Sequence, residues 1–483
     1  MPGLFASIAN TDVSKPNVLV QPPDGKRWLC GLKKGRPLFV RECYAWFYDE
    51  AVRRRSDPDC PGLIYTGNPG IGKSTWLNYA LVRFLQDGYT VVLERAKKKD
   101  FFVFQDGRCT YKEKSVSASV LSDLPERSVY LFDPDENESH PLESDVFTIV
   151  ATSPQVKHYK ALRKDGGRRF YFPCWSLEEL QGLKLDLAPE ELEKRFLLWG
   201  GVPRHIVENE ILMGDLSQAI EHVDLRMIEK YQGSAEIEEQ DQVKLRHMLV
   251  QYHIDFPFDK PCIDFASPEI GRRIVESRAK KDYRDLIRHY EEVRLGEWQG
   301  PYAGHLWEEL CHAILSRGSE DGYCLQRLGE KGGAVDDKWL FKQPLAVTRS
   351  SVEKGKYFRP LAKNYPVIDA AIWEGNVVFG LQTTLQESYA PTAAQVVELM
   401  RKLLPGGGGG KAKTALHLVW VVDPSKNWRF GAQSFKGLES LKQNEKKLLD
   451  GVVQWRLCLR FPQESPFARV QGEGESSNKK QQK

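Results

Sequence analysis

Residues 67–74 read Gly67-Asn68-Pro69-Gly70-Ile71-Gly72-Lys73-Ser74, and this stretch decides the fold of the first part of the chain. It has the spacing GxxxxGKS and lies between an apolar run at 63–65 and an amphipathic segment at 74–87. A glycine-rich turn between a strand and a helix points successive backbone N–H groups at one place, where they can cradle phosphates. Lys73 adds a full charge, and the hydroxyl of Ser74, with Thr75 as a second hydroxyl, suits Mg²⁺. The segment therefore predicts a nucleoside triphosphate site with Mg²⁺.

Further apolar runs indicate a parallel sheet around this loop. The runs at 63–65, 89–93, 128–132 and 146–152 are almost continuous, as expected of strands covered on both faces. Residues 38–55 have apolar side chains at helical spacing and predict a helix before the first strand. The fold class predicted for this part is α/β, with three layers.

Polar residues at the ends of these runs are candidate partners of the nucleotide. Asp133 ends the run at 129–132 on what we take to be a neighbouring strand, and we predict that it holds the metal. Glu136 is the candidate base for the attacking water, with Asp135 as the competing choice. Thr152 ends the next run and predicts a hydroxyl beside the γ-phosphate, although a simple strand-terminating turn explains it equally well. Arg204, after a helix end, would reach phosphate if the following helices fold over the nucleotide.

The rest of the chain divides by its periodicity. Residues 176–295 favour a helical subdomain, with helices expected at 192–199, 216–231, 236–252 and 267–295. A second α/β domain follows, with helices at 305–315 and 393–404 and strands at 365–373, 376–385 and 416–422. We expect five parts, namely an extension at 1–35, a nucleotide-binding core at 36–175, the helical subdomain at 176–295, the second domain at 296–470 and a disordered tail at 471–483.

Composition is that of an ordinary globular protein and excludes several classes. Of 483 residues, 41% are hydrophobic and 28% are charged, and the net charge is +3, so composition names no partner. The nine cysteines form no CxxC pair, which disfavours a zinc site and a disulfide framework. No run of about 18 uncharged apolar residues occurs, so we expect no membrane partner. Oligomeric state is left open.

Four motifs together resemble a known family. GNPGIGKS, FVRECY at 39–44, YLFDPDE at 130–136 and WGGVPRH at 199–205 resemble, in this order, the NTPase of the Crinkler effectors of oomycetes and fungi and of the related retrotransposon hot spot proteins of trypanosomes. The resemblance covers roughly residues 35–460. It implies a P-loop NTPase of the signal-transduction (STAND, AAA-like) type with a GxP motif, here Gly201-Val202-Pro203. It also implies a second domain of the PD-(D/E)xK, restriction-endonuclease-like class.

The resemblance assigns candidate nuclease residues in the second domain. Asp369 fits the Asp of the pattern, whereas the acidic-x-Lys that should follow is Gln382-Thr383-Thr384, so Gln382 stands for the acid and Thr384 for the lysine. Glu308, with Glu309 beside it, would be the remaining carboxylate. Such a set could hold one divalent metal, because an amide oxygen is a hard ligand. Three lysines upstream are candidates to replace the missing one: Lys338, Lys342 and Lys363.

Three functions remain open from the sequence. The first is an ATP-regulated (or GTP-regulated) nuclease, with DNA as a partner. The second is a nucleotide switch whose second domain binds DNA or a host protein without cleavage, and the third is a DNA-handling ATPase of a mobile element. Basic clusters at 53–55, 97–99, 163–169 and 278–281 are candidate phosphate contacts or simply solvated faces. Family resemblance places the protein in a host nucleus after secretion, although no LxLFLAK-like header is recognisable in this chain.

Overall fold

The structure is a computed structural model that divides into two compact units, Met1–Ile270 and Gly271–Lys483. It describes residues 3–23, 27–135, 139–154, 156–226, 247–295, 301–318, 322–329, 335–336, 347–348, 351–360, 365, 367–386, 388–404, 414–425 and 430–462. The predicted tail at 471–483 lies outside these residues. The mixed α/β class predicted from the sequence is confirmed.

The residues before α2 form one short helix and two paired strands in the first unit. Helix α1 (Leu4–Ala9) is followed by strand β1 (Val18–Val20), which pairs antiparallel with β2 (Leu38–Val40). Helix α2 (Glu42–Arg55) begins only after this strand, so the prediction of one helix from residue 38 was wrong at its start. Leu38, Phe39 and Val40 are all buried, and a short apolar run of this kind fits a strand as well as a helix.

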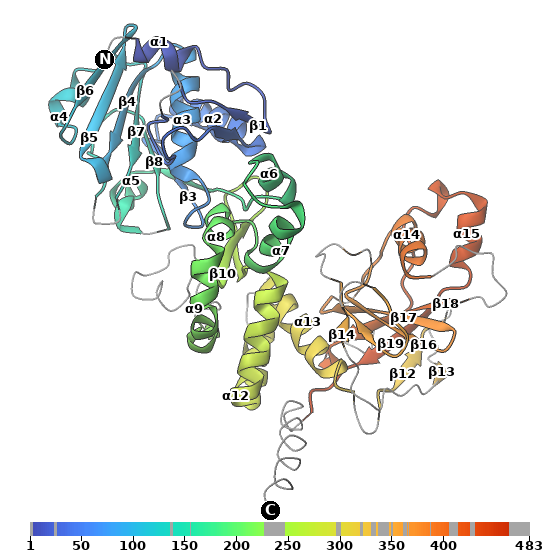
Figure 1. The fold of residues 1–483 in the computed structure, drawn as a ribbon. Coiled ribbons are helices and arrows are strands. Elements are labelled where there is room, and N and C mark those ends of the chain that lie inside the picture. The colour runs from blue at the N-terminus through green and yellow to red at the C-terminus, as the bar shows by residue number, and fades with distance from the viewer. Residues whose placement is uncertain are drawn as a thin grey trace, which may run out of the picture. The chain divides into compact units, whose positions relative to one another are not determined.

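A seven-stranded sheet forms the centre of the first unit, in the order β6-β5-β4-β7-β8-β3-β9. Its strands in chain order are β3 (Gly62–Thr66), β4 (Thr90–Arg95), β5 (Asp100–Gln105), β6 (Arg108–Lys112), β7 (Ser128–Asp133), β8 (Thr148–Ala151) and β9 (Arg168–Tyr171). The five from β4 to β9 are parallel, and β5 and β6 add an antiparallel edge. Helix α3 (Lys73–Gln86) packs on this sheet (Figure 1).

The strand order corrects one expectation. Asp133 ends β7, which is not the direct neighbour of β3, because β8 lies between them. All three strands are parallel, so their carboxyl ends still meet at one edge of the sheet. The carboxylate therefore remains within reach of the loop that follows β3.

Short helices and a two-stranded sheet complete the first unit. The helices are α4 (Ala118–Ser122), α5 (Lys160–Lys164), α6 (Leu177–Gly182), α7 (Pro189–Trp199), α8 (Pro203–Val207) and α9 (Asn209–His222). The strands β10 (Val250–Ile254) and β11 (Pro261–Phe265) pair antiparallel. The expected helix at 236–252 was therefore wrong at its end, where Val250 to Tyr252 are extended, and residues 236–246 lie outside the description. The region after 176 is thus not entirely helical.

The chain passes from the first unit to the second inside helix α12 (Pro268–Leu295), which has a non-helical residue at Asp282. We predicted this boundary at 295/296 from the change in periodicity. The two units meet at Ile270/Gly271 inside α12, where the helical periodicity of the sequence continues without a change.

The second unit is built on an eight-stranded mixed sheet, in the order β13-β12-β19-β18-β17-β16-β15-β14. Its strands in chain order are β12 (Leu325–Arg327), β13 (Val335–Asp336), β14 (Val347–Thr348), β15 (Tyr357–Phe358), β16 (Ala370–Glu374), β17 (Val377–Thr384), β18 (Ala415–Val422) and β19 (Val453–Cys458). Its helices are α13 (Pro301–Leu315), α14 (Ala393–Leu403) and α15 (Gln443–Leu449). The central β16–β17 hairpin and the parallel pair β17–β18 place the candidate nuclease residues. Within the described residues, no helix is long and apolar enough to cross a membrane.

Candidate functional site

The candidate phosphate loop, residues 67–74, joins β3 to α3. Gly67, Gly70 and Gly72 have φ of 138°, 83° and 106°, a region that side chains with a Cβ rarely adopt. Lys73 begins α3, and its ammonium group donates to the carbonyl oxygens of Gly67 and Asn68, both at 2.9 Å. The loop thus curls around the Lys73 side chain in front of the free N–H groups of the helix.

Two side-chain contacts fix the shape of this loop. The Asn68 amide accepts from Tyr252 N at 2.8 Å and donates to Tyr252 O at 2.9 Å, so the loop is hydrogen-bonded to β10. The Trp175 indole N–H donates to Ile71 O at 2.9 Å. Pro69, between these anchors, is half-buried. A loop held at both ends costs less to order when a ligand binds.

Asp133 lies near Ser74 at the start of α3. Burial raises the pKa of the Asp133 carboxyl, and the nearby Ser74 hydroxyl and Cys30 thiol oppose this shift. A hydroxyl and a carboxylate are hard oxygen ligands, so the pair fits Mg²⁺ or its bound water. Thr75, the next residue, is half-buried in the first turn of the helix.

Thr152 and Arg204 also lie near the candidate phosphate loop. Thr152 N donates to Tyr65 O in β3, and the Thr152 hydroxyl is buried without a hydrogen-bond partner in the described structure. A Cβ added to Gly70 would stand 2.5 Å from Arg204 Cβ and 3.0 Å from Arg204 Nε, so this arginine lies directly against the loop. An unpartnered buried hydroxyl and a cation beside the loop are what a phosphate would satisfy.

The charges around Lys73 change its acidity. Burial, together with the nearby Arg204 guanidinium, lowers the pKa of Lys73 to about 7, and Asp133 opposes this shift. Burial in low dielectric disfavours the ammonium form. A bound anion beside Lys73 would oppose this shift.

The residue that would activate water at this site is unassigned. Glu136 lies outside the described residues. The competing Asp135 accepts a hydrogen bond from the Ser139 hydroxyl at 2.7 Å.

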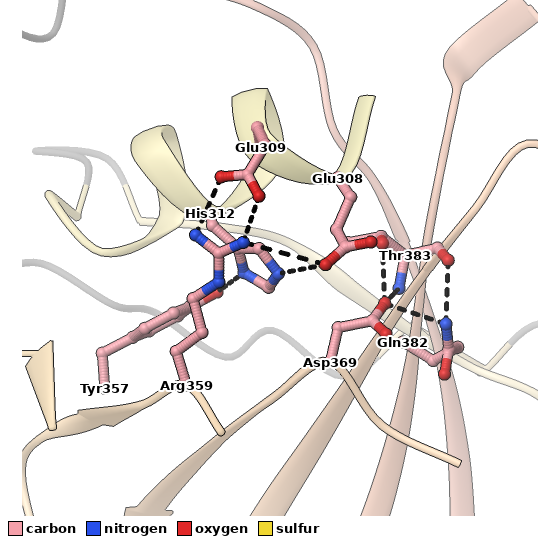
Figure 2. Close-up of polar contacts among 8 residues, drawn as sticks. All are labelled: Glu308, Glu309, His312, Tyr357, Arg359, Asp369, Gln382 and Thr383. Carbon is pink, nitrogen blue, oxygen red and sulfur yellow. Dashed lines mark hydrogen bonds and ion pairs between the residues drawn. The ribbon is translucent and has the colours of Figure 1, made fainter. Parts of the chain in front are cut away.

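In the second unit, Asp369 and Gln382 face each other across β16 and β17. One Asp369 carboxylate oxygen accepts from Gln382 Nε2 at 2.8 Å and from the Thr383 N–H and hydroxyl, both at 2.7 Å (Figure 2). Asp369 N also donates to Leu381 O, which fixes the register. The structure therefore brings Asp369 and Gln382 together. It also shows that Thr383 binds the Asp369 carboxylate, a contact that the sequence spacing did not indicate.

Glu308 reaches the same place from α13, and its carboxylate points toward Asp369 (Figure 2). Burial raises the pKa of Asp369 to about 6, the negative charge of Glu308 adds to this shift, and His312 opposes it. A divalent cation beside these two carboxylates would favour the ionised form of Asp369.

A buried polar network beside Glu308 was not anticipated. His312 Nε2 lies 3.7 Å from a Glu308 oxygen, and the Tyr357 hydroxyl is 2.7 Å from His312 Nδ1. Arg359 Nη2 lies 3.8 Å from Glu308, while the same guanidinium binds both oxygens of the buried Glu309. Glu309 is thus a structural partner of Arg359, and Glu308 faces Asp369. The spacing of Glu308 and His312, one helical turn apart, was the available signal.

Thr384 stands at the position of the missing lysine. The Thr384 hydroxyl accepts from Gln386 N at 3.0 Å. Lys338, Lys342 and Lys363 lie outside the described residues. Arg359 lies 3.8 Å from Glu308, but its guanidinium is already bound to Glu309.

Three-residue clusters of His, Cys, Asp or Glu suited to a metal are absent from the described part of the chain. A cation at the second site would therefore be held by Glu308, Asp369 and the amide oxygen of Gln382, or not at all. The Gln382 amide nitrogen already points at Asp369, so its oxygen is directed elsewhere. This donor set fits a metal less well than the three acids of an ordinary site.

Two of the candidate basic clusters have structural partners, and in the cluster at 163–169 Arg169 Nη1 donates to the Tyr159 hydroxyl at 3.3 Å. Arg53 and Arg54 both bind Glu50, and Arg55 donates to Glu126 O.

Comparison with known proteins gives one relative and no family assignment. No family model matches the chain. Crinkler effector protein 15 of Phytophthora infestans is 24% identical over an alignment of 385 residues, which covers 71% of this chain and 58% of the relative. The chain is similar to a Crinkler effector. It spans less than two thirds of that relative's length, and the similarity supports the resemblance seen in the motifs without showing what either unit does.

Proposed function

We propose that the first unit binds ATP or GTP with Mg²⁺ at residues 67–74 and hydrolyses it. The observation that carries this proposal is the convergence of Lys73, Ser74 and Asp133 at the start of α3. The lowered pKa of Lys73 and the unpartnered Thr152 hydroxyl support it, since both features describe a site that lacks an anion. In this proposal Lys73 and Arg204 bind phosphate, while Ser74 and Asp133 hold the metal.

Turnover of ATP tests this assignment. The wild-type chain should release phosphate from ATP in the presence of Mg²⁺, and Lys73→Ala should abolish this release. Lys97→Ala is a matched control, because it removes a lysine from the surface of the same unit. Equal turnover in wild type and Lys73→Ala would contradict the assignment.

We further propose that the second unit cleaves DNA with a divalent metal at Glu308, Asp369 and Gln382. Support comes from the approach of Glu308 to Asp369 and from the raised pKa of Asp369. Phosphodiester cleavage requires carboxylates that hold a metal at the scissile phosphate. Thr383 would hold Asp369 in place, and His312, fixed by the Tyr357 hydroxyl, would lie beside Glu308.

Nucleotide state would control the second unit through α12. The chain passes between the units inside this helix, and Arg204 lies against the candidate phosphate loop on the segment that precedes it. Loss of the γ-phosphate would remove the partner of Arg204 and change the packing of α8. A helix shared by both units could transmit such a change.

Plasmid nicking tests the nuclease proposal. With Mn²⁺ or Mg²⁺, wild type should nick supercoiled plasmid and Asp369→Ala should not, and Lys73→Ala should lose any ATP dependence of the nicking. Glu353→Ala is a control, since it removes an exposed carboxylate of the same unit that binds Lys356. Intact plasmid with both wild type and Asp369→Ala would overturn the proposal.

A second candidate is a nucleotide switch whose second unit binds DNA or a host protein without cleaving. The observation that favours it is the Gln382 amide, which donates to Asp369 where the pattern requires an acid, together with Thr384 in place of lysine. Under this alternative, filter binding would detect DNA association that Asp369→Ala leaves unchanged. Because the similar Phytophthora protein is named an effector, we propose that this chain acts in a host cell, with the nucleus as the site where DNA is available.

A further inference from the structure

A segment from outside the predicted nucleotide-binding core lies on the candidate phosphate loop. Residues 28–31 precede β2, and we call them the N-terminal strap. Asn78 in α3 holds this strap, because its Oδ1 accepts from Leu29 N and Cys30 N, both at 3.0 Å, and its Nδ2 donates to Cys30 O at 2.7 Å. Arg95 adds a hydrogen bond to Leu29 O at 2.7 Å. The strap is therefore built into the first unit by side chains from α3 and β4.

The N-terminal strap lies next to Asp133 and Thr75, the two residues that the metal and the nucleotide would use. Cys30 is buried and lies close to Asp133, because the negative charge of Asp133 adds to the effect of burial in raising the pKa of the thiol. Gly31 has a φ of 68°, and a Cβ on it would stand 2.7 Å from both the N and the Oγ1 of Thr75. The Thr75 N–H belongs to the first turn of α3, where backbone donors are free for an anion.

We propose that the N-terminal strap is an autoinhibitory contact that must open before the nucleotide and Mg²⁺ are fully bound. Gly31 lies against Thr75, whose N–H a phosphate oxygen would use. Cys30 lies beside the Asp133 carboxylate, which a metal-bound water would use. This inference rests on the proposed nucleotide site and names the segment that regulates it.

Gly31→Ala tests the strap directly, because the added Cβ cannot fit against Thr75 and residue 31 must move away. Gly35→Ala is the matched control: Gly35 has a φ of 75°, so it bears the same backbone strain, but a Cβ there would meet nothing within 4 Å. If the strap is closed about nine-tenths of the time, opening it should tighten ATP binding about tenfold, as population shift requires. Cys30→Ala, which removes the contact to Asp133, should tighten binding in the same direction.

Two measurements on the full chain separate the outcomes. The first is the Kd of ATP with Mg²⁺, and the second is alkylation of Cys30 by N-ethylmaleimide, followed by peptide mass spectrometry. Cys30 should react slowly in wild type, faster with ATP and Mg²⁺, and fast in Gly31→Ala without nucleotide, whereas Gly35→Ala should behave as wild type.

Two results would overturn the strap. If wild type binds ATP while Cys30 stays protected, or if Gly31→Ala and Cys30→Ala bind ATP no tighter than wild type, residues 28–31 are a fixed wall of the site. In that case the proposed nucleotide site stands. If neither wild type nor any strap variant binds ATP, the strap and the nucleotide site fail together.

Discussion

Nucleotide binding at Lys73 should take up a proton at alkaline pH. In the free protein, burial and Arg204 lower the pKa of Lys73 to about 7, so at pH 8 only about a tenth of the side chains carry the proton. Bound phosphate supplies the missing negative charge and raises this pKa again. Each ATP bound should therefore bring about 0.9 proton onto the protein at pH 8.

Proton uptake on binding determines how the affinity for ATP changes with pH. Because the complex holds the proton more tightly than the free protein, binding weakens as pH rises above the free pKa, roughly tenfold between pH 8 and pH 9. Isothermal titration calorimetry in buffers of different ionisation enthalpy measures the uptake. At pH 8 the phosphates of the nucleotide are already ionised, since their last pKa is about 6.

Lys73→Arg supplies the control for this experiment. Arginine keeps its charge throughout this range, so whatever affinity the variant retains should come without proton uptake. Uptake near zero in wild type at pH 8 would refute the account of a buried Lys73 that lacks an anion, and so would equal uptake in wild type and Lys73→Arg.

Three further predictions concern the two sites and the network between α13 and β15. Arg359→Met should lower the free energy of unfolding in urea by about 3–5 kcal/mol, because the buried Glu309, only 4% exposed, loses its partner. Arg401→Met removes a more exposed ion pair and should have little effect. Equal losses of stability in the two variants would contradict this prediction. Asp133→Asn should reduce ATP turnover roughly a hundredfold, measured as phosphate release, and unchanged turnover would remove Asp133 from the metal site. Since burial and Glu308 raise the pKa of Asp369 to about 6, Mn²⁺ binding to the second unit should weaken as pH falls through 6, and a flat profile from pH 5 to pH 8 would rule out this carboxylate as a ligand.

The sequence predicted the local conformation around residues 67–74 because the elements that form it are contiguous. The loop at 67–74, the strand before it and the helix after it are contiguous, so residue type and spacing specify their conformation. Asp133 was found for the same reason, at the end of an apolar run. The strand order was not predictable, because the insertion of β8 between β3 and β7 depends on pairings between distant segments.

Other features depend on contacts that carry no local signal. The strap at 28–31 has neither helical nor strand periodicity, and it is fixed by Asn78, which is 48 residues away from Cys30. Arg359 is likewise placed by Glu309, 50 residues earlier. The roles of such side chains depend on contacts between distant segments, so hydrophobic periodicity does not distinguish them from ordinary surface charges or loop residues. The start of α2 was misassigned because Leu38 to Val40 is apolar enough for either kind of element.

The central claim is that residues 67–74 bind a nucleoside triphosphate, and equilibrium binding of ATP with Mg²⁺ tests it most directly. Calorimetric titration of the wild-type chain should show one site per molecule, and Lys73→Ala should lose this binding while its unfolding profile shows a folded protein. Absence of binding in wild type, or an unchanged Kd in Lys73→Ala, would contradict the claim.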